Sequence, residues 1–563
     1  MSLRSRLALG LAVLTVALGT PAAATAASLE PAARSAVDAP LASGDPATLT
    51  LVVPLTVPPN ETGLLDVDTL TRYTAPLGLL TRQLDALAGA PVAIGLDPLI
   101  AASIRVLGTS APASALAWLD RLRAAPNEVF ALAYADADVS AAASTGSLGL
   151  LAPIGFDFAV DPANFGEAQT ASPTPTPSAS PDENAAPPLP TLEDLLEWPY
   201  TLEHVAWPAD DTATSDTVAA MGAAGYETVI LSSDNVSDNV PTVNLGAVTG
   251  VVSDAPLSAL LRAATYAASD LELQDTLDAL DASLVAFAAA KPGGEIVATL
   301  DRHWPFLSYH LADVIARLSA SPAVAFGTLA ATIERPGVDA TVTDHPEEAG
   351  RLSVISSLLT GVAAEGQFAT VLADPLLITA QRRLELLALL SVSWLPTPDS
   401  WATATATFLG RSGEIVSSVR ITHGSDLLLL SRSTEVRVAV SNALPYPVSV
   451  RVTITPQRPL IRVIENSVLL EIEPDATKTA FIPVEAIANG VVSIQVVLTS
   501  PAGVPVDSGF VRARLQAEWE TVGTVVALAV IVLVFGFGIG RTIVKRRRAK
   551  RAAAEESTGR MSR

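Results

Sequence analysis

The chain has 563 residues, of which 49% are hydrophobic and only 17% are charged, and it contains no cysteine. At roughly 150 residues per domain, this length predicts three to four domains. The lack of cysteine excludes disulfide scaffolds, thiolate metal sites, iron–sulfur clusters and thiol nucleophiles. A formal net charge of -23 argues against a nucleic-acid partner, because phosphates attract basic surfaces.

The first 26 residues have the three parts of a secretory signal peptide. Arg4 and Arg6 precede an uncharged apolar run at 7–18, and the Ala-Thr-Ala sequence at 24–26 fits a cleavage site. The apolar run is short for a bilayer span, although a retained N-terminal anchor is the alternative. The sequence therefore predicts an exported chain that begins near residue 27.

Residues 45–345 alternate short apolar runs with amphipathic stretches. This alternation is typical of a parallel sheet covered by helices, and it predicts a (β/α) barrel-like domain; a doubly wound open sheet is the alternative. The expected strands are 49–55, 92–96, 129–134, 204–207, 228–231, 250–252, 295–300 and 323–329. The expected helices include 79–87, 113–124, 214–224, 257–267 and 304–318.

A proline-rich insertion at 171–190 interrupts this pattern. Seven of its twenty residues are proline, which predicts an extended surface loop; a domain boundary is the alternative. From 346 to 422 the pattern is helical, with a long amphipathic stretch at 368–394 and further helical pieces at 399–411 and 414–419. We expect this helical segment to pack against the barrel-like domain.

Residues 423–516 have the pattern of a β-sandwich. Short apolar or alternating runs are separated by turn residues, which indicates an immunoglobulin-like domain that lacks the cysteine pair of antibody domains. A role as a stalk or spacer follows from its place before the C-terminal apolar segment. The expected strands are 436–440, 448–454, 467–472, 478–483, 491–498 and 509–514.

The C-terminal segment at 521–544 is expected to be a transmembrane helix in contact with the lipid bilayer. Positions 521–540 are uncharged, Trp519 precedes them, and a basic tail at 545–563 follows. By the positive-inside rule, the tail is cytoplasmic and the protein is a single-pass type I protein of the cell membrane. Residues 27–520 then carry a net charge of −32 outside. An excess of arginine over lysine indicates a GC-rich genome, such as that of a high-GC Gram-positive bacterium.

Polar and aromatic side chains follow most of the expected strands. In a parallel barrel such positions converge on one face, and carboxylates beside aromatic rings are typical of a carbohydrate site. Arg302 lies at the last of these strand ends, without an assigned role. The candidate ligand-binding residues are Asp97, Tyr134, Asp136, Trp207, Asp234, Asp254, Asp301, His303 and Trp304.

Each of these aspartates has a structural alternative, because Asp is a common N-cap residue and Asp97 directly precedes a proline. The familiar nucleotide-binding, hydrolase and metalloprotease motifs do not occur in the sequence. His303 and His310 are not placed on one helix face with acidic partners as a metal site would require. We therefore assign no catalytic residue, no metal ligand and no cofactor.

Several stretches together resemble a family of actinobacterial envelope proteins of unknown function. They are VAIGLDP at 92–98, ALAYADAD at 131–138, Trp207-Pro208, VILSSD at 229–234, the immunoglobulin-like segment and the basic-tailed span. The resemblance covers nearly the whole chain after residue 26. It implies a barrel that is a divergent relative of polysaccharide deacetylases and glycoside hydrolases, although LTVPP at 55–59 lacks the deacetylase aspartate pair. It also implies a role in cell-wall biogenesis, because family members are often encoded beside the lipid II flippase.

Three functions remain open from the sequence. The first is a non-catalytic, membrane-anchored envelope protein that binds a glycan or a protein partner, such as the flippase, in cell-wall biogenesis. The second is a glycan-active hydrolase that uses strand-end aspartates as acid and base, which requires two carboxyl groups about 5–10 Å apart. The third is a purely structural surface protein.

Overall fold

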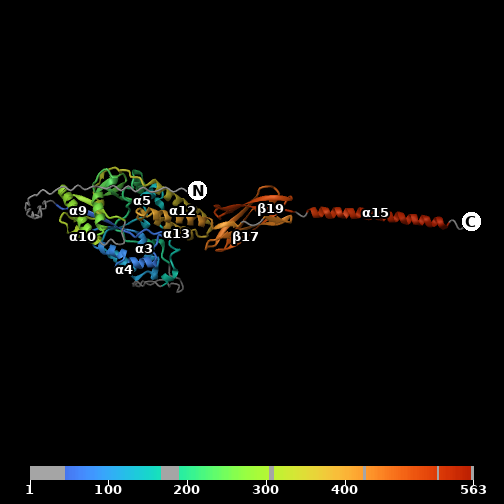
Figure 1. Cartoon of the computed structure of the whole chain (residues 1–563), viewed down its shortest axis with the longest axis horizontal. Helices are drawn as coiled ribbons and strands as arrows, with labels where there is room; N and C mark the ends of the chain where they lie inside the picture. The colour runs from blue at the N-terminus through green and yellow to red at the C-terminus, as the bar shows by residue number, and fades with distance from the viewer. Residues whose placement is uncertain (1–44, 167–188, 303–309, 423–425, 517–518, 559–563) are drawn as a thin grey trace, which may run out of the picture. The chain divides into compact units, whose positions relative to one another are not determined.

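The computed structural model describes residues 45–166, 189–302, 310–422, 426–516 and 519–558. The expected signal peptide, nearly all of the proline-rich insertion, and the candidates His303 and Trp304 lie outside these ranges. Along the described chain, an α/β region is followed by helices, two further sheets and a long C-terminal helix (Figure 1). The mixed α/β class predicted from the sequence is confirmed.

One mostly parallel sheet forms the centre of the N-terminal region. In chain order it contains β1 (Ala47–Leu55), β2 (Ala93–Leu96), β3 (Val129–Ala131), β4 (Val205–Ala206), β5 (Thr228–Ser232), β6 (Thr242–Leu245), β7 (Val248–Ser253), β8 (Glu295–Thr299), β9 (Val324–Phe326) and β10 (Val338–Asp339). The parallel path runs β4–β5–β7–β8–β1–β2–β3, and β9 pairs with the start of β1. β6 pairs with β7, and β10 pairs with β6. The short β6 and β10 were not predicted.

The parallel path curves into a half-barrel whose two ends approach each other. Phe130 of β3 forms a parallel bridge with Leu202, three residues before β4, and the backbone N–H groups of Thr201 and Leu202 donate to the Val129 carbonyl. The inward side chains pack into a small apolar cluster of their own: Val52, Ala93, Phe130, Leu132, Val205, Trp207, Ile230, Val251, Val297 and Leu329. A complete (β/α) barrel remains a prediction.

The helices of this region pack their apolar faces against the sheet, mostly on its outside, and the last of them, at 329–333, contributes Leu329 to the inner cluster. They are α1 (Val67–Tyr73), α2 (Leu79–Leu87), α3 (Pro98–Arg105), α4 (Ala113–Ala124), α5 (Val139–Ser144), α6 (Leu192–Leu196), α7 (Ser215–Ala223), α8 (Ala255–Thr265), α9 (Asp270–Ala290), α10 (Leu311–Ala320) and α11 (Leu329–Ile333). The bounds of α2 and α4 are those predicted, because apolar residues recur along one face of each. The 21-residue α9 was missed, although Leu273, Leu277, Leu280 and Leu284 are buried at helical spacing.

The expected strand at 323–329 ends early, and its last residue begins α11 instead. Thr328 caps this helix by accepting from the Ala331 N–H. Glu128, directly before β3, accepts from the Leu329 N–H at 2.6 Å and the Ala330 N–H at 3.1 Å. A carboxylate at a helix N-terminus is favourable, so α11 is fixed at the amino-terminal end of β3.

Three longer helices form the next region: α12 (Ala349–Phe368), α13 (Leu376–Leu389) and α14 (Pro398–Val416). Pro375 precedes α13, so the long helix expected at 368–394 is divided. The buried Arg382 guanidinium joins all three, because it contacts Glu365 at 2.8 Å, Glu385, and the Phe408 carbonyl at 2.9 Å. The expected helical segment extended to 422, whereas Val419–Thr422 forms a strand of the following region.

Two sheets with a common apolar core make up the next region. The first has the order β11–β13–β17–β15 and the second β12–β19–β18–β14–β16. Their strands are β11 (Val419–Thr422), β12 (Leu427–Leu429), β13 (Ser433–Asn442), β14 (Val448–Pro456), β15 (Ile461–Val463), β16 (Ser467–Ile472), β17 (Thr477–Ala486), β18 (Gly490–Thr499) and β19 (Pro505–Leu515). We call this pair of sheets the sandwich; its immunoglobulin-like class remains a prediction.

The C-terminal helix α15 (Trp519–Thr558) contains the predicted span at 521–544. Its segment Gly523–Arg548 is long and apolar enough to cross a membrane, since 26 helical residues rise about 39 Å against a hydrocarbon core of about 30 Å. The segment Ala349–Val371 also passes this test, but a third of its apolar window is buried inside the protein. The orientation and the single-pass topology remain predictions.

Candidate functional site

Asp97 occupies the carboxyl end of β2 and is the N-cap of α3. Its Oδ1 accepts from the Leu99 N–H at 2.9 Å and from the Ala135 N–H at 2.9 Å. The side chain is buried, and burial together with the nearby negative charge of Asp136 raises the pKa of Asp97 well above its usual range. The capping alternative therefore describes this residue, which also fixes the loop after β3.

The loop after β3 is strained. Ala135 and Asp136 have φ values of 59° and 50°, which place two successive non-glycine residues in the left-handed region. Such positions cost about 1–3 kcal/mol each and persist only where the surroundings hold them. The Asp97 bond to Ala135 is one restraint, and the Tyr134 hydroxyl, which donates to the Gly63 carbonyl at 2.7 Å, is another. The expected strand 129–134 was too long, because the observed strand ends at Ala131, before this loop.

Arg302, which follows β8, contacts residues that follow β3 and β4. Its Nε lies 2.9 Å from Asp136 Oδ1, and its terminal nitrogens donate to the carbonyls of Trp207 and Pro208. The guanidinium carbon is 4.5 Å from the centre of the Trp207 ring, a cation–π distance. Only 6% of Arg302 is exposed. We call Asp97, Tyr134, Asp136, Trp207 and Arg302 the Arg302 cluster.

Four of the nine predicted site residues thus converge in the Arg302 cluster, and the others described do not join it. Asp254 caps α8 through the Leu257 N–H at 2.9 Å and accepts from Asn239 at 3.0 Å. Asp301 is half-buried, and its negative charge adds to burial in raising the pKa of Tyr266. Asp234 is exposed. Arg302, the residue that organises the cluster, was not among the predicted site residues.

A second, more exposed set of charges lies at the ends of β4 and β5. Arg262 pairs with Asp210 at 2.6 Å, and His345 Nδ1 lies 3.9 Å from Asp211 Oδ1. Partial burial and the charges of Asp210 and Asp234 raise the pKa of Asp211. Among the residues that the structure describes, no three His, Asp or Glu side chains gather as metal ligands.

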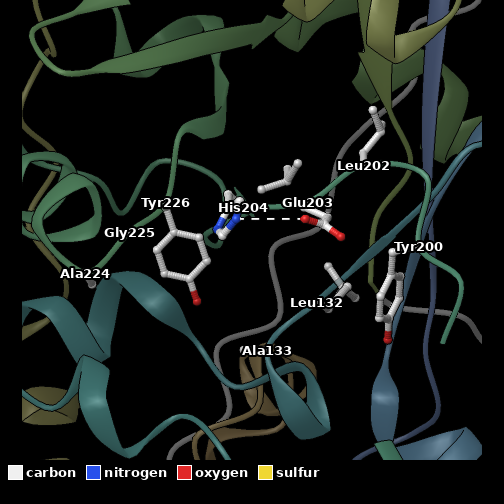
Figure 2. Close-up of a pocket in the computed structure, with 11 residues that line it drawn as sticks. Leu132, Ala133, Tyr200, Leu202, Glu203, His204, Ala224, Gly225 and Tyr226 are labelled. Carbon is white, nitrogen blue, oxygen red and sulfur yellow. Dashed lines mark ion pairs between the residues drawn. The ribbon is translucent and has the colours of Figure 1, made fainter. Parts of the chain in front are cut away.

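An open cavity of 450 Å³ lies beside the Arg302 cluster, at the junction of β3 and β4. Its wall is formed by residues from three segments: Ala131, Leu132, Ala133, Tyr200, Leu202, Glu203, His204, Val205, Ala224, Gly225 and Tyr226. Figure 2 shows the Tyr200 and Tyr226 rings on opposite sides, with Glu203 and His204 between them. We call this the tyrosine cavity.

The backbone at His204, which lies in the polar part of the tyrosine cavity, has a left-handed conformation. His204 has a φ of 57°, and its carbonyl accepts from the Glu227 N–H at 2.9 Å. This conformation leaves 55% of the imidazole exposed, with Nε2 at 4.0 Å from Glu203 Oε2. Sequence reasoning placed 204–207 in a strand and gave His204 no role, because nothing local indicates a left-handed histidine.

A curved, mostly parallel sheet covered by helices, a sandwich, and a C-terminal helix long and apolar enough to cross a membrane define a mixed α/β protein with a candidate C-terminal span. The chain belongs to the DUF6049 family, a family of unknown function whose model matches residues 14–555. The predicted resemblance to a family of unknown function is confirmed to that extent. The actinobacterial origin and the deacetylase-like barrel remain predictions. A comparison with curated proteins gave no match.

Several solved structures are weakly similar to parts of the chain. The α-amylase AmyC from Thermotoga maritima has a TM-score of 0.41 at 10% identity, over 66% of this chain and 93% of that one. Escherichia coli alpha-2-macroglobulin has a TM-score of 0.15 at 18% identity, over 18% of this chain. The match spans only 7% of the macroglobulin chain.

Proposed function

We propose that this protein is a membrane-anchored cell-envelope protein whose α/β domain binds a glycan in cell-wall biogenesis without cleaving it. In this proposal, the half-barrel is a divergent (β/α) barrel, α15 is a type I anchor, and the sandwich is an immunoglobulin-like spacer. A protein partner in the same membrane, such as the lipid II flippase, remains part of the proposal.

The proposal that the protein does not cleave its ligand rests on the structural roles of the strand-end carboxylates. Asp97 and Asp254 cap helices, and Asp136 pairs with Arg302. General acid–base catalysis needs a carboxyl group that reaches the substrate, and Asp97 and Asp136 are both almost fully buried. Three of the strand-end aspartates, Asp97, Asp136 and Asp254, are therefore engaged in the fold, whereas Asp234 is exposed.

The tyrosine cavity supports the binding part. Sugar rings stack on aromatic faces, and Tyr200 and Tyr226 offer two such faces across 450 Å³ of open space. Exposed Glu203 and His204 add hydrogen-bonding groups that would orient hydroxyl groups. The strongly acidic character of residues 27–520 favours a neutral or cationic glycan over an anionic one.

Binding of the full-length protein in detergent to peptidoglycan fragments and neutral envelope oligosaccharides, with product analysis on the same samples, tests this proposal. We expect binding without new reducing ends, and loss of binding in Tyr200→Ala and Tyr226→Ala. Tyr446→Ala, which removes a half-buried tyrosine of the sandwich, is the matched control and should bind normally. Turnover would favour the hydrolase, and an absence of binding in folded protein would favour a structural role.

A further inference from the structure

One end of the sandwich gathers the residues closest in sequence to the membrane helix. β19 ends there, and the antiparallel register places Gly490 of β18 opposite Leu515. The Gln516 N–H donates to the Leu429 carbonyl at 2.9 Å, and the Ala486 N–H donates to the Arg432 carbonyl at 2.7 Å. We call residues 428–432, 457–465, 485–491 and 512–516 the anchor-side end.

Large apolar side chains are exposed at the anchor-side end. The fraction exposed is 55% for Leu428, 51% for Leu430, 63% for Ile464, 57% for Ile487 and 51% for Val491. The loops at the opposite end, 443–447, 473–476 and 500–504, contribute none of the sandwich's exposed large apolar residues. The remaining exposed large apolar residues of the described sandwich, Leu469, Phe481 and Phe510, lie along the strands. The anchor-side end thus holds five of eight, and such a concentration is typical of an interaction surface.

The anchor-side end is also basic. It contains two glutamates, and Glu485 is paired with Arg432 at 3.2 Å and with Arg462 at 3.4 Å. Its net charge is +3, within a region, 27–520, that carries −32. The five arginines, all exposed, are Arg432, Arg458, Arg462, Arg512 and Arg514.

The chain holds this surface close to the bilayer. Only three peptide steps separate Gln516 from Trp519, the first residue of α15, so the gap is at most about 11 Å even when fully extended. The apolar segment of α15 begins four residues later, at Gly523. A headgroup layer several ångströms thick borders the hydrocarbon core, which brings the anchor-side end within reach of phospholipid headgroups.

We propose that the anchor-side end docks on anionic phospholipid headgroups of the same bilayer that holds α15. Aliphatic side chains enter the interface while arginines pair with phosphates, the combination that binds peripheral proteins to membranes. This inference rests on the proposed membrane anchoring. If the docking occurs, the sandwich rests on the membrane surface and supports the α/β domain.

Full-length protein reconstituted in vesicles tests this docking, and the lack of native cysteine allows single-cysteine labelling. Fluorophores are placed at Val491→Cys in the anchor-side end, Ala502→Cys at the opposite end, and Val532→Cys within α15. The vesicles contain phosphatidylglycerol and brominated phosphatidylcholine, which quenches nearby fluorophores. We expect strong quenching at 532, quenching at 491 about threefold greater than at 502, and loss of that difference without phosphatidylglycerol.

A charge-matched pair of variants completes the test. In the Val491→Cys background, Arg512→Ser with Arg514→Ser should abolish the excess quenching, whereas Arg420→Ser with Arg451→Ser, outside the anchor-side end, should not. Quenching at 532 with equal quenching at 491 and 502 overturns the docking and leaves the anchor intact. No quenching at 532 overturns the anchor itself, and the docking with it.

Discussion

The Arg302 cluster and the tyrosine cavity lie side by side at the β3–β4 junction. The polar groups of the cluster are buried and paired within the protein, whereas those of the cavity are exposed to solvent. Both contain non-glycine residues with positive φ, Asp136 in the first and His204 in the second. In the cluster the strained residue is turned inward and its charge is paired, whereas in the cavity it leaves a ring exposed to solvent. Strain alone therefore does not mark a site; what matters is whether the protein or the solvent satisfies the side chain.

Removing the Arg302 guanidinium should have the largest effect on stability. Arg302→Met should lower the stability of the α/β domain by about 3–5 kcal/mol, because the buried Asp136 carboxylate would lose the guanidinium with which it forms an ion pair. Thermal unfolding of the full-length protein followed by circular dichroism measures this loss. Arg335→Met, which removes an exposed arginine paired with Glu295, is the control and should cost less than about 1 kcal/mol. Equal losses would refute the special role of Arg302.

The pH dependence of stability tests whether Asp97 is a buried N-cap with a raised pKa. Since its pKa is raised in the folded state, its favourable contribution is complete below the unfolded pKa, about 3.9, and is lost as pH rises through the folded pKa. Asp97→Asn keeps the capping oxygen but cannot ionise. Its stability relative to the natural protein should therefore increase between pH 4 and pH 7. Denaturant unfolding across this range measures the effect, and a constant difference would contradict the raised pKa.

A substitution in the tyrosine cavity should weaken glycan binding without lowering the stability of the protein. His204→Gly suits the positive φ and removes the ring, so the melting temperature should stay the same or rise. Glycan affinity should fall about tenfold, equivalent to about 1.4 kcal/mol. Calorimetric titration with the oligosaccharides bound by the natural protein provides the measurement. Unchanged affinity would remove His204 from the binding site.

The smallest expected effect concerns the strained loop. Ala135→Gly should stabilise the domain by about 1 kcal/mol, because glycine accepts a φ of 59° without strain. The control Ala137→Gly, at a φ of -62°, should destabilise it by about 0.5–1 kcal/mol. Opposite shifts in melting temperature would locate the strain at residue 135, and equal shifts would argue against it.

Local patterns predicted the elements well, and distant contacts limited the prediction of the site. Helices α2 and α4 were predicted with their observed bounds because their leucines repeat at helical spacing, and Asp97-Pro98 was recognised as a candidate cap. Arg302 could not be assigned, because its partners Asp136 and Trp207 lie 166 and 95 residues away in the chain. The left-handed Ala135 and His204 are not glycine, so the sequence offered no sign of the turns that shape the two neighbouring sites.

The pairing of β12 with β19 has a mechanical consequence. These strands are parallel, with Leu427 opposite Ala513 and Leu429 opposite Leu515. If α15 is anchored as proposed, tension from the α/β region would first load β11, which pairs with β13, and after its release would pull β12 from its first residue and β19 from its last. The two strands would then slide past each other, so their hydrogen bonds would be loaded together in shear rather than opened one at a time. The parallel β12–β19 pair would therefore make the sandwich resist stretching between the α/β region and α15.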